Sequence, residues 1–192
     1  MTMRRVEAPA ELDGPILIEP AVHGDHRGFL QETYRLGAYV DRGITEEFVQ
    51  DNHSRSGQGI LRGMHFQVGA GQAKLVRCAR GSILDVLVDI RRGSPTFGRW
   101  QGFELDDEKL HQLYCPIGFA HGFIVLSEIA DVMYKCSAYY DPSIERGIAW
   151  NDPEIGIDWP GDIEIRTSER DDNAPRLSEV AGELPFVYVP RS

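Results

Sequence analysis

The stretch Ser82-Ile83-Leu84-Asp85-Val86-Leu87-Val88-Asp89-Ile90 carries the clearest structural signal in the chain. Its residues alternate with a period of two. The apolar side chains at 84, 86, 88 and 90 share one face of an extended chain, and Asp85 and Asp89 lie on the other. Gly81 precedes the stretch, and a Gly-Ser-Pro turn signal follows it. We therefore predict a β-strand over residues 82–90.

Short apolar stretches separated by turn signals continue on both sides of this strand. Helical signals are few: residues 36–42 end at Gly43, and a single turn is expected over 178–182. This pattern predicts an all-β fold, a double-sheet jelly roll or a related barrel with a few short helices and wrapping segments at both ends. Further strands are predicted over residues 73–79, 98–105, 113–115, 122–126 and 130–140.

The size and charge of the chain narrow its possible functions. Its 192 residues suffice for a single domain, with a core over about residues 45–145 and a tail over 152–192 that wraps the barrel. A formal charge of −10 disfavours binding to nucleic acid or to an anionic membrane. We see no membrane span and no signal peptide, and three cysteines without a close pairing indicate reduced thiols in a cytoplasmic protein.

Two stretches carry polar side chains where a strand normally carries packing residues. Gln50 and Asn52 would share one face and could bind the edge of a planar polar ligand, although asparagine also favours turns. Arg62 offers a charged fork suited to phosphate. His65 shares a face with Gln67, but a lone histidine among apolar neighbours is more often a core residue with one hydrogen bond.

Three further features allow either a functional or a structural interpretation. His121 lies between two phenylalanines and beside a glycine, which fits a ligand site or a bulge with a buried histidine. Tyr134 and Tyr140 would share one face of the strand over 130–140, as an acid and a stacking ring or as part of an aromatic core. Lys74 could stabilise an oxyanion or extend to the rim.

The sequence predicts no catalytic metal and no cofactor. His65 and His121 lie far apart in the sequence, and there is no Cys-x-x-Cys. His23 and His26 are three residues apart in a stretch that is more typical of a solvated turn. No dinucleotide-binding or P-loop glycine pattern indicates a nicotinamide or ATP site.

Taken together, these stretches resemble the dTDP-4-dehydrorhamnose 3,5-epimerase family. The resemblance covers nearly the whole chain, and it includes Asp-His-Arg-Gly-Phe at 25–29 and Leu-Arg-Gly-Met-His-Phe-Gln at 61–67. Because several motifs are long and occur in order, the match is specific. The remaining motifs lie at 48–54, 74–78, 89–91, 94–98, 118–123, 150–153, 157–160 and 168–175.

The resemblance implies a cupin-like jelly roll that works as a homodimer without metal. It implies an enzyme that inverts C3 and C5 of dTDP-4-dehydro-6-deoxy-D-glucose to give dTDP-4-dehydro-L-rhamnose. By position, the catalytic base is His65, its paired carboxylate is Asp171 from the C-terminal segment, and the catalytic tyrosine is Tyr134. Lys74 and His121 match the positions that approach the sugar.

The resemblance also implies contacts to the nucleotide sugar. Tyr140 matches the aromatic residue that stacks on thymine, and Arg170 stands where many family members have lysine before the paired aspartate. A guanidinium and an ammonium are not equivalent, so the contact at this position is open. The other matching contacts are Arg27, Glu32, Gln50, Asn52, Arg62 and Glu145.

These residues predict a proton-transfer mechanism. A C4 ketone acidifies the C–H bonds at C3 and C5, and a neutral histidine suits the base. Asp171 would fix the tautomer of His65, Lys74 would hold the enolate oxygen, and Tyr134 would return a proton from the opposite face.

Three alternatives remain at the level of sequence. The enzyme could invert only C3 or only C5 in a natural-product pathway, since pocket shape decides this. The chain could be a non-catalytic binder of sugar nucleotides, although a decayed site would be expected to have lost one of the four catalytic residues. It could also be a metal-dependent cupin such as a dioxygenase.

Overall fold

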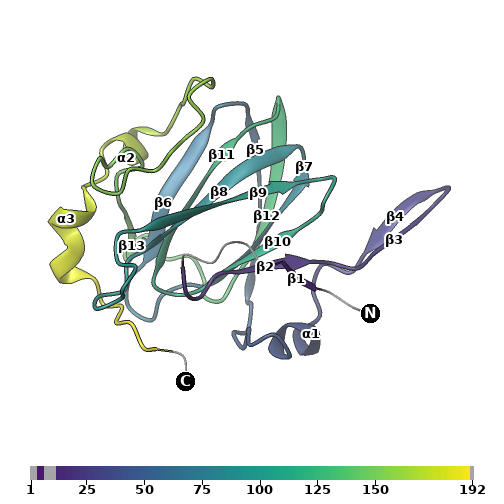
Figure 1. Ribbon diagram of the computed structural model, residues 1–192, viewed down its shortest axis with the longest axis horizontal. Coiled ribbons are helices and arrows are strands. Elements are labelled where there is room, and N and C mark those ends of the chain that lie inside the picture. Colours follow the sequence, from purple (N-terminus) through teal and green to yellow (C-terminus); the bar gives the residue numbers. More distant parts are fainter. Residues whose placement is uncertain (1–3, 7–11, 191–192) are drawn as a thin grey trace.

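A computed structural model describes residues 4–6 and 12–190 of the chain. Two antiparallel sheets face each other (Figure 1), with strand orders β1-β2-β10-β7-β12-β5 and β13-β6-β11-β8-β9, and the predicted all-β jelly roll is confirmed. The strands are β1 (Arg4–Val6), β2 (Ile16–Glu19), β3 (Val22–Asp25), β4 (Gly28–Gln31), β5 (Gln50–Gly57), β6 (Leu61–Gln67), β7 (Lys74–Arg80), β8 (Ser82–Asp89), β9 (Trp100–Asp106), β10 (Gln112–Cys115), β11 (Phe119–Val125), β12 (Ile129–Cys136) and β13 (Glu145–Gly147). The helices are α1 (Leu36–Val40), α2 (Glu169–Asp172), α3 (Leu177–Val180) and the 3₁₀ turn η1 (Ala181–Glu183).

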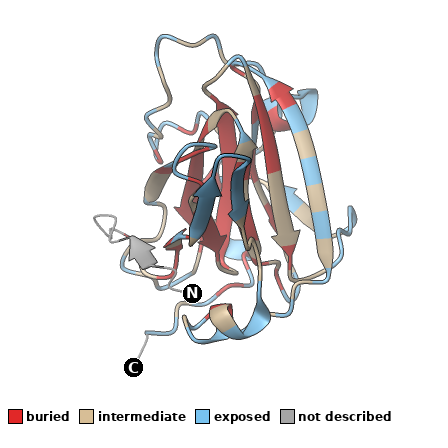
Figure 2. Cartoon of the chain, turned by 90° about the vertical axis from the view of Figure 1, so that its right-hand side faces the viewer, coloured by how far each residue is buried: buried red, intermediate tan, exposed pale blue. Residues whose placement is uncertain are grey.

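Strand β8 is buried on both faces, which explains why both of its faces are rich in apolar residues. Ile83 and Leu87 point between the two sheets into the main core cluster. Val86 and Val88 point the other way, into a second cluster that the C-terminal segment covers. Asp85 and Asp89 therefore lie on the interior face, and both are fully buried. Figure 2 shows this contrast between buried inner strands and exposed outer segments.

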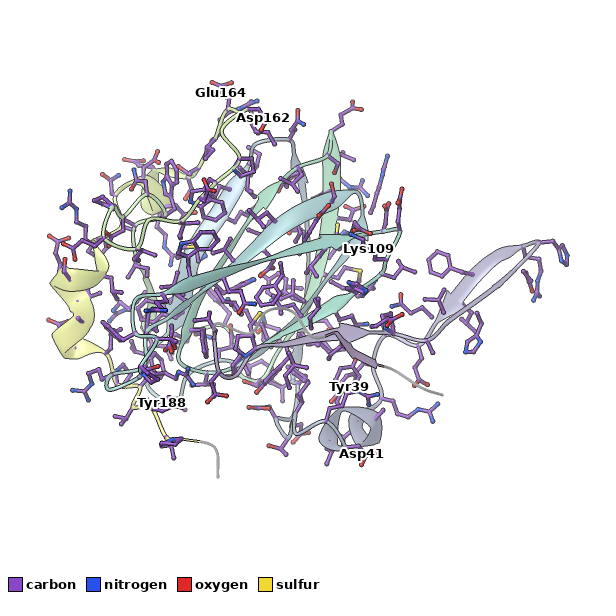
Figure 3. The ribbon with its side chains drawn as sticks, viewed as in Figure 1. Tyr39, Asp41, Lys109, Asp162, Glu164 and Tyr188 are labelled. Atoms are coloured by element: carbon purple, nitrogen blue, oxygen red, sulfur yellow. The ribbon has the colours of Figure 1, made fainter. Side chains whose placement is uncertain are left out.

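The two ends of the chain cover the outer faces of the sheets. Leu177, Leu184 and Phe186 from the C-terminal segment pack on the outer face of the five-stranded sheet. On the six-stranded sheet, Tyr39 and Ile44 close a third cluster. Figure 3 shows side chains filling these layers, with Tyr39 on α1 and Tyr188 on the C-terminal segment.

Strand β12 is shorter than the sequence predicts. It ends at Cys136, because its neighbours both begin opposite this residue: β5 at Gln50 and β7 at Lys74. With no partner strand beyond Cys136, the chain leaves the ladder. Tyr140 therefore lies in a loop rather than on the strand that carries Tyr134, and the prediction that both tyrosines share one strand face is wrong.

Strands β3 and β4 form a hairpin that extends away from both sheets (Figure 1). Its apolar side chains Phe29 and Leu30 are 60% and 73% exposed. Elsewhere, Cys78, Cys115 and Cys136 are buried free thiols, as predicted. Across the described ranges, no helix has the length and hydropathy that crossing a membrane requires.

Candidate active site

A pocket of about 470 Å³ opens between the two sheets beside the segment that leads into α2. The loop that carries Asp162 and Glu164 lies at the edge of the molecule (Figure 3). The residues that follow this loop, Arg166, Thr167 and Ser168, form one wall of the pocket. A parallel bridge between Ile60 and Arg166 fastens the wall to the start of β6. The pocket is lined by Ser54, Ile60, Leu61, Arg62, His65, Lys74, His121, Phe123, Tyr134, Arg166, Thr167, Ser168, Arg170 and Asp171.

His65 and Asp171 meet in this pocket although 106 positions separate them in the chain. The His65 Nε2 and Asp171 Oδ1 atoms are 2.7 Å apart. Ser168 caps α2 by accepting a hydrogen bond from the Asp171 amide, which fixes the turn that presents the carboxylate. Burial alone would raise the pKa of Asp171, but hydrogen bonds and charge from His65 lower it below its usual value. The carboxylate is therefore ionised at neutral pH and can orient the ring.

Tyr134 and Lys74 approach from the opposite wall. His65 belongs to β6 in the five-stranded sheet, whereas Tyr134 on β12 and Lys74 on β7 belong to the six-stranded sheet. Burial, together with the nearby Cys136 thiol, raises the pKa of Tyr134. Its phenol thus keeps its proton at neutral pH and is available as an acid.

A second histidine pairs with a carboxylate inside the barrel. His121 lies directly opposite His65 across the β6–β11 ladder, and its Nε2 atom is 2.9 Å from Asp85 Oδ2. Its Nδ1 atom is 3.5 Å from the Lys74 Nζ atom. The register shifts between His121 and Phe123, so the predicted bulge and the predicted pocket residue are both present.

Three arginines line the pocket. Arg62 donates from Nε to the Ser56 hydroxyl at 3.1 Å, and Arg166 and Arg170 also line the pocket. Arg170 donates to Glu145 at 2.7 Å; burial opposes the charge of Glu145, but this bond keeps its pKa below the usual value. A chain with a net charge of −10 therefore has a local site suited to an anion.

The predicted nucleotide contacts Gln50, Asn52 and Tyr140 form a linked group. The Gln50 amide donates to Asn52 Oδ1 at 3.0 Å, so the two share a strand face as predicted. The Tyr140 backbone N–H donates to Gln50 Oε1 at 2.9 Å, and a hydrogen bond between the Tyr140 hydroxyl and Glu145 raises the pKa of Tyr140. None of the three lines the pocket itself.

Arg27 and Glu32 lie away from the pocket of their own chain. Arg27 stands at the tip of the β3–β4 hairpin and pairs with Asp25, with its Nε atom 3.1 Å from the carboxylate. Glu32 pairs with Arg35 ahead of α1. Neither residue is among those that line the pocket, so a single chain does not bring all the predicted contacts together.

Sequence reasoning assigned no role to Asp85, Ser54, Arg166 or Ser168. The alternation placed Asp85 on the face away from the apolar residues at 84, 86, 88 and 90, and the structure shows that this face lies between the two sheets. Ser54 alternates with Asn52 and was detectable by strand parity; its hydroxyl is buried without a hydrogen-bond partner. Arg166 had no signal, since only the path of the C-terminal segment brings it to the pocket, and Ser168 was included only as the first residue of the motif at 168–175.

One group of side chains has the donor atoms for a metal ion. The ligand atoms of Asp85, Cys115 and His121 lie within 4.8 Å of one another. The three residues fit a cation poorly, because the Lys74 ammonium lies 3.5 Å from one ring nitrogen and Asp85 already occupies the other. Burial also holds the pKa of the Cys115 thiol well above its usual value, which disfavours the thiolate that binds metals.

Comparison with known proteins identifies the family of the chain. A family model described as dTDP-4-dehydrorhamnose 3,5-epimerase matches residues 9–179. The chain belongs to this family. A dTDP-4-dehydrorhamnose 3,5-epimerase of Pseudomonas aeruginosa is 52% identical over 157 residues, which are 81% of this chain and 87% of that protein.

Solved structures of the family superpose closely on the chain. The crystal structure of a 3,5-epimerase from Legionella pneumophila in complex with dTDP-4-keto-L-rhamnose has a TM-score of 0.93 and 44% identity, and the match covers 98% of this chain and all of that one. The chain is also similar to a relative that is named as a 3-epimerase and not as a 3,5-epimerase. A dTDP-4-dehydro-6-deoxyglucose 3-epimerase of Streptomyces bikiniensis is 41% identical over 182 residues, or 92% of each chain.

Proposed function

We propose that this protein inverts C3 and C5 of dTDP-4-dehydro-6-deoxy-D-glucose through enolate intermediates and yields dTDP-4-dehydro-L-rhamnose. The observation that carries the proposal is that the His65–Asp171 pair and Tyr134 lie on opposite walls of one pocket. A base and an acid on opposite walls can remove a proton from one face of a sugar ring and return another to the other face, which is what inversion requires.

The remaining pocket residues supply what the enolate needs. Lys74 stabilises the enolate oxygen by its charge, so this step needs no metal ion. Asp171 keeps the proton on His65 Nε2 and leaves Nδ1 as the basic nitrogen. The C–H proton moves to Nδ1, the C–H electrons form the enolate, and Tyr134 then protonates the carbon from the other side.

The arginines that line the pocket are assigned to the diphosphate. Arg62 and Arg170 provide guanidinium forks of the kind that bind phosphate oxygens. Gln50, Asn52, Tyr140 and Glu145 form a linked group next to Arg170 and suit the nucleoside. The sugar is assigned to the dyad, because the ring must lie between His65 and Tyr134.

Arg27 enters the site only if a second copy of the chain supplies it. We propose a homodimer in which the β3–β4 hairpin reaches the pocket of the partner subunit. The exposed Phe29 and Leu30 support this arrangement, because apolar side chains of a projecting hairpin gain by burial against another surface. We assign the protein to the cytoplasm, which its three free thiols support.

Mixing two inactive variants tests the dimer. If Arg27 acts in the partner's site, a hybrid of Arg27→Ala and His65→Ala subunits contains one site with both residues intact, and activity returns on mixing. If Arg27 acts within its own chain, no hybrid site is intact. A dimer measured by light scattering without any recovery on mixing would contradict the proposed exchange.

Incubation with the keto-sugar in D₂O tests the reaction. We expect NMR to detect deuterium at both C3 and C5 of the product. Deuterium at one carbon only would identify a single-position epimerase, which the similarity to the Streptomyces bikiniensis 3-epimerase makes the specific rival. Binding of dTDP without any deuterium incorporation would identify a non-catalytic binder.

A further inference from the structure

Three charged or titratable side chains form a chain of contacts through the interior of the barrel. Asp85 on β8 is fully buried, and its Oδ2 atom is 2.9 Å from His121 Nε2 on β11. His121 Nδ1 in turn is 3.5 Å from Lys74 Nζ on β7. The contacts therefore cross from the five-stranded sheet to the six-stranded sheet at the base of the pocket.

These distances determine where the protons lie. A carboxylate accepts hydrogen bonds, so His121 carries a proton on Nε2 and donates it to Asp85. The Lys74 ammonium only donates, so His121 Nδ1 must be the unprotonated acceptor. A doubly protonated ring would set an N–H group against the ammonium. Burial and Lys74 lower the pKa of His121 while Asp85 opposes them, which agrees with a neutral ring.

With both nitrogens engaged, His121 has no free position from which to exchange a proton with the sugar. The ring instead links a buried negative charge to the ammonium. Asp85 and Lys74 thus lie on either side of one bridging ring, which fixes the position and direction of the lysine side chain.

We propose that Asp85 is a positioning residue for the epimerisation. It acts through His121, whose tautomer it fixes, and thereby holds the Lys74 ammonium at the position of the enolate oxygen. The kinetic tests of this inference rest on the proposed function, because they measure epimerisation. The contacts among Asp85, His121 and Lys74 do not depend on it.

The main test is Asp85→Asn, which keeps the size of the side chain and removes its charge. We expect kcat to fall about 10- to 100-fold, a typical loss for one preorganised electrostatic contact, while KM changes less than about threefold. The loss should fall on kcat and leave dTDP affinity unchanged, because the contact positions a group at the enolate and not at the nucleotide. An unchanged kcat, or a loss of dTDP affinity that matches the fall in kcat, would overturn the proposal.

Asp89→Asn is the matched control. Asp89 lies on the same strand and is equally buried, but its carboxylate accepts hydrogen bonds from Arg91, Ser94 and Thr96 at the end of β8. This variant should lower the melting temperature and leave kcat close to that of the wild type. An equal loss of kcat in both variants would mean that any buried aspartate on β8 has this effect, and would overturn the specific role of Asp85.

Lys74→Ala provides a second, independent measurement. If Asp85 acts through Lys74, adding Asp85→Asn to Lys74→Ala should reduce kcat by less than about twofold further. If the kcat of the double variant falls by the product of the losses in the two single variants, the proposal is wrong. So would loss of wild-type activity on chelation, since the Asp85, Cys115 and His121 group would then be a metal site.

The wild-type protein offers a test that needs no variant and no substrate. The ¹⁵N shifts of the His121 ring should report a proton on Nε2 and none on Nδ1 throughout the neutral pH range. An imidazolium or the opposite tautomer would overturn the proposal even if Asp85→Asn fails to fold. An absence of epimerase activity in the wild type would instead refute the proposed function and leave the tautomer result standing.

Discussion

Two of the histidine–aspartate pairs among the described residues have their histidines on the neighbouring strands β6 and β11, and they differ in what surrounds the second ring nitrogen. His65 and Asp171 form the outer pair, with side chains 23% and 5% exposed, and the aspartate comes from a short helix far along the chain. His65 Nδ1 has no hydrogen-bond partner among the described residues. His121 and Asp85 form the inner pair, in which Lys74 occupies the other nitrogen.

This difference suits the outer ring to accept a proton and the inner ring to bridge two charged side chains. In both pairs the carboxylate fixes the tautomer by accepting from Nε2. We propose that the outer ring takes the proton from carbon, because its Nδ1 atom has no hydrogen-bond partner among the described residues and His65 lines the pocket. In the same proposal the inner ring passes the orienting effect of its carboxylate to Lys74. The same two residue types would then serve two roles, and the role would depend on the third contact.

The largest expected effect separates the two rings directly. His65→Asn should reduce kcat by at least about 10³-fold, because a positioned general base is lost. His121→Asn should cost about 10- to 100-fold, because Lys74 remains but is held less well. The ratio of the two losses is measured by NMR under identical conditions, with dTDP affinity and melting temperature as controls for folding. Equal losses would break the distinction between base and bridge.

The next effect concerns the carboxylate of the outer pair. Asp171→Asn should lower kcat about 10²- to 10³-fold, because an amide can stabilise the wrong tautomer of His65. Gly63, whose amide lies 3.4 Å from Asp171 Oδ2, would also lose a charged acceptor. Retention of more than half of the wild-type kcat would show that the ring needs no fixed tautomer.

The same variant should have a characteristic pH dependence of stability. The folded-state pKa of Asp171 is lowered by His65 despite the opposing effect of burial. Its stabilising contribution is therefore complete above the pKa of an unfolded aspartate and disappears as the pH falls through the lowered value. The difference in melting temperature between wild type and Asp171→Asn should shrink on acidification, and a difference that grows would contradict this sign.

Tyr134→Phe tests the opposite wall of the pocket. We expect kcat for inversion to fall about 10²-fold, because the acid is lost while the base remains. His65 should still exchange the substrate C–H with solvent from its own face, so deuterium should enter the substrate without inversion. His65→Asn is the control, since it should abolish both exchange and inversion. Loss of exchange in Tyr134→Phe as well would remove the division of roles between the two sheets.

Much of this arrangement could be predicted because it depends on local periodicity. Alternation identified β8 and the shared face of Gln50 and Asn52, and the ordered motifs identified the family. Strand ends were less predictable. Tyr140 follows Tyr134 at an even spacing, but β12 ends where its neighbours begin, and no local signal marks that point.

The rest depends on contacts between segments that are distant in sequence. Pairing of Asp171 with His65 followed from family resemblance and not from spacing, because α2 reaches the pocket only through the covering C-terminal segment. The contact between Lys74 and His121 joins two sheets, and strand periodicity gives no information across that gap. Arg27 could be assigned a role by position, but its own chain does not carry it to the pocket.

The smallest expected effect concerns Arg170, which precedes Asp171 of the outer pair and also lines the pocket. Arg170→Lys keeps the charge but gives up the fork that binds Glu145, so we expect KM to rise about two- to fivefold with little change in kcat. Arg170→Ala should raise KM further, because the charge is lost as well. Steady-state kinetics with the dTDP-sugar measures both variants. If Arg170→Lys lowered kcat as strongly as Asp171→Asn, Arg170 would belong with the outer pair in proton transfer rather than with the diphosphate.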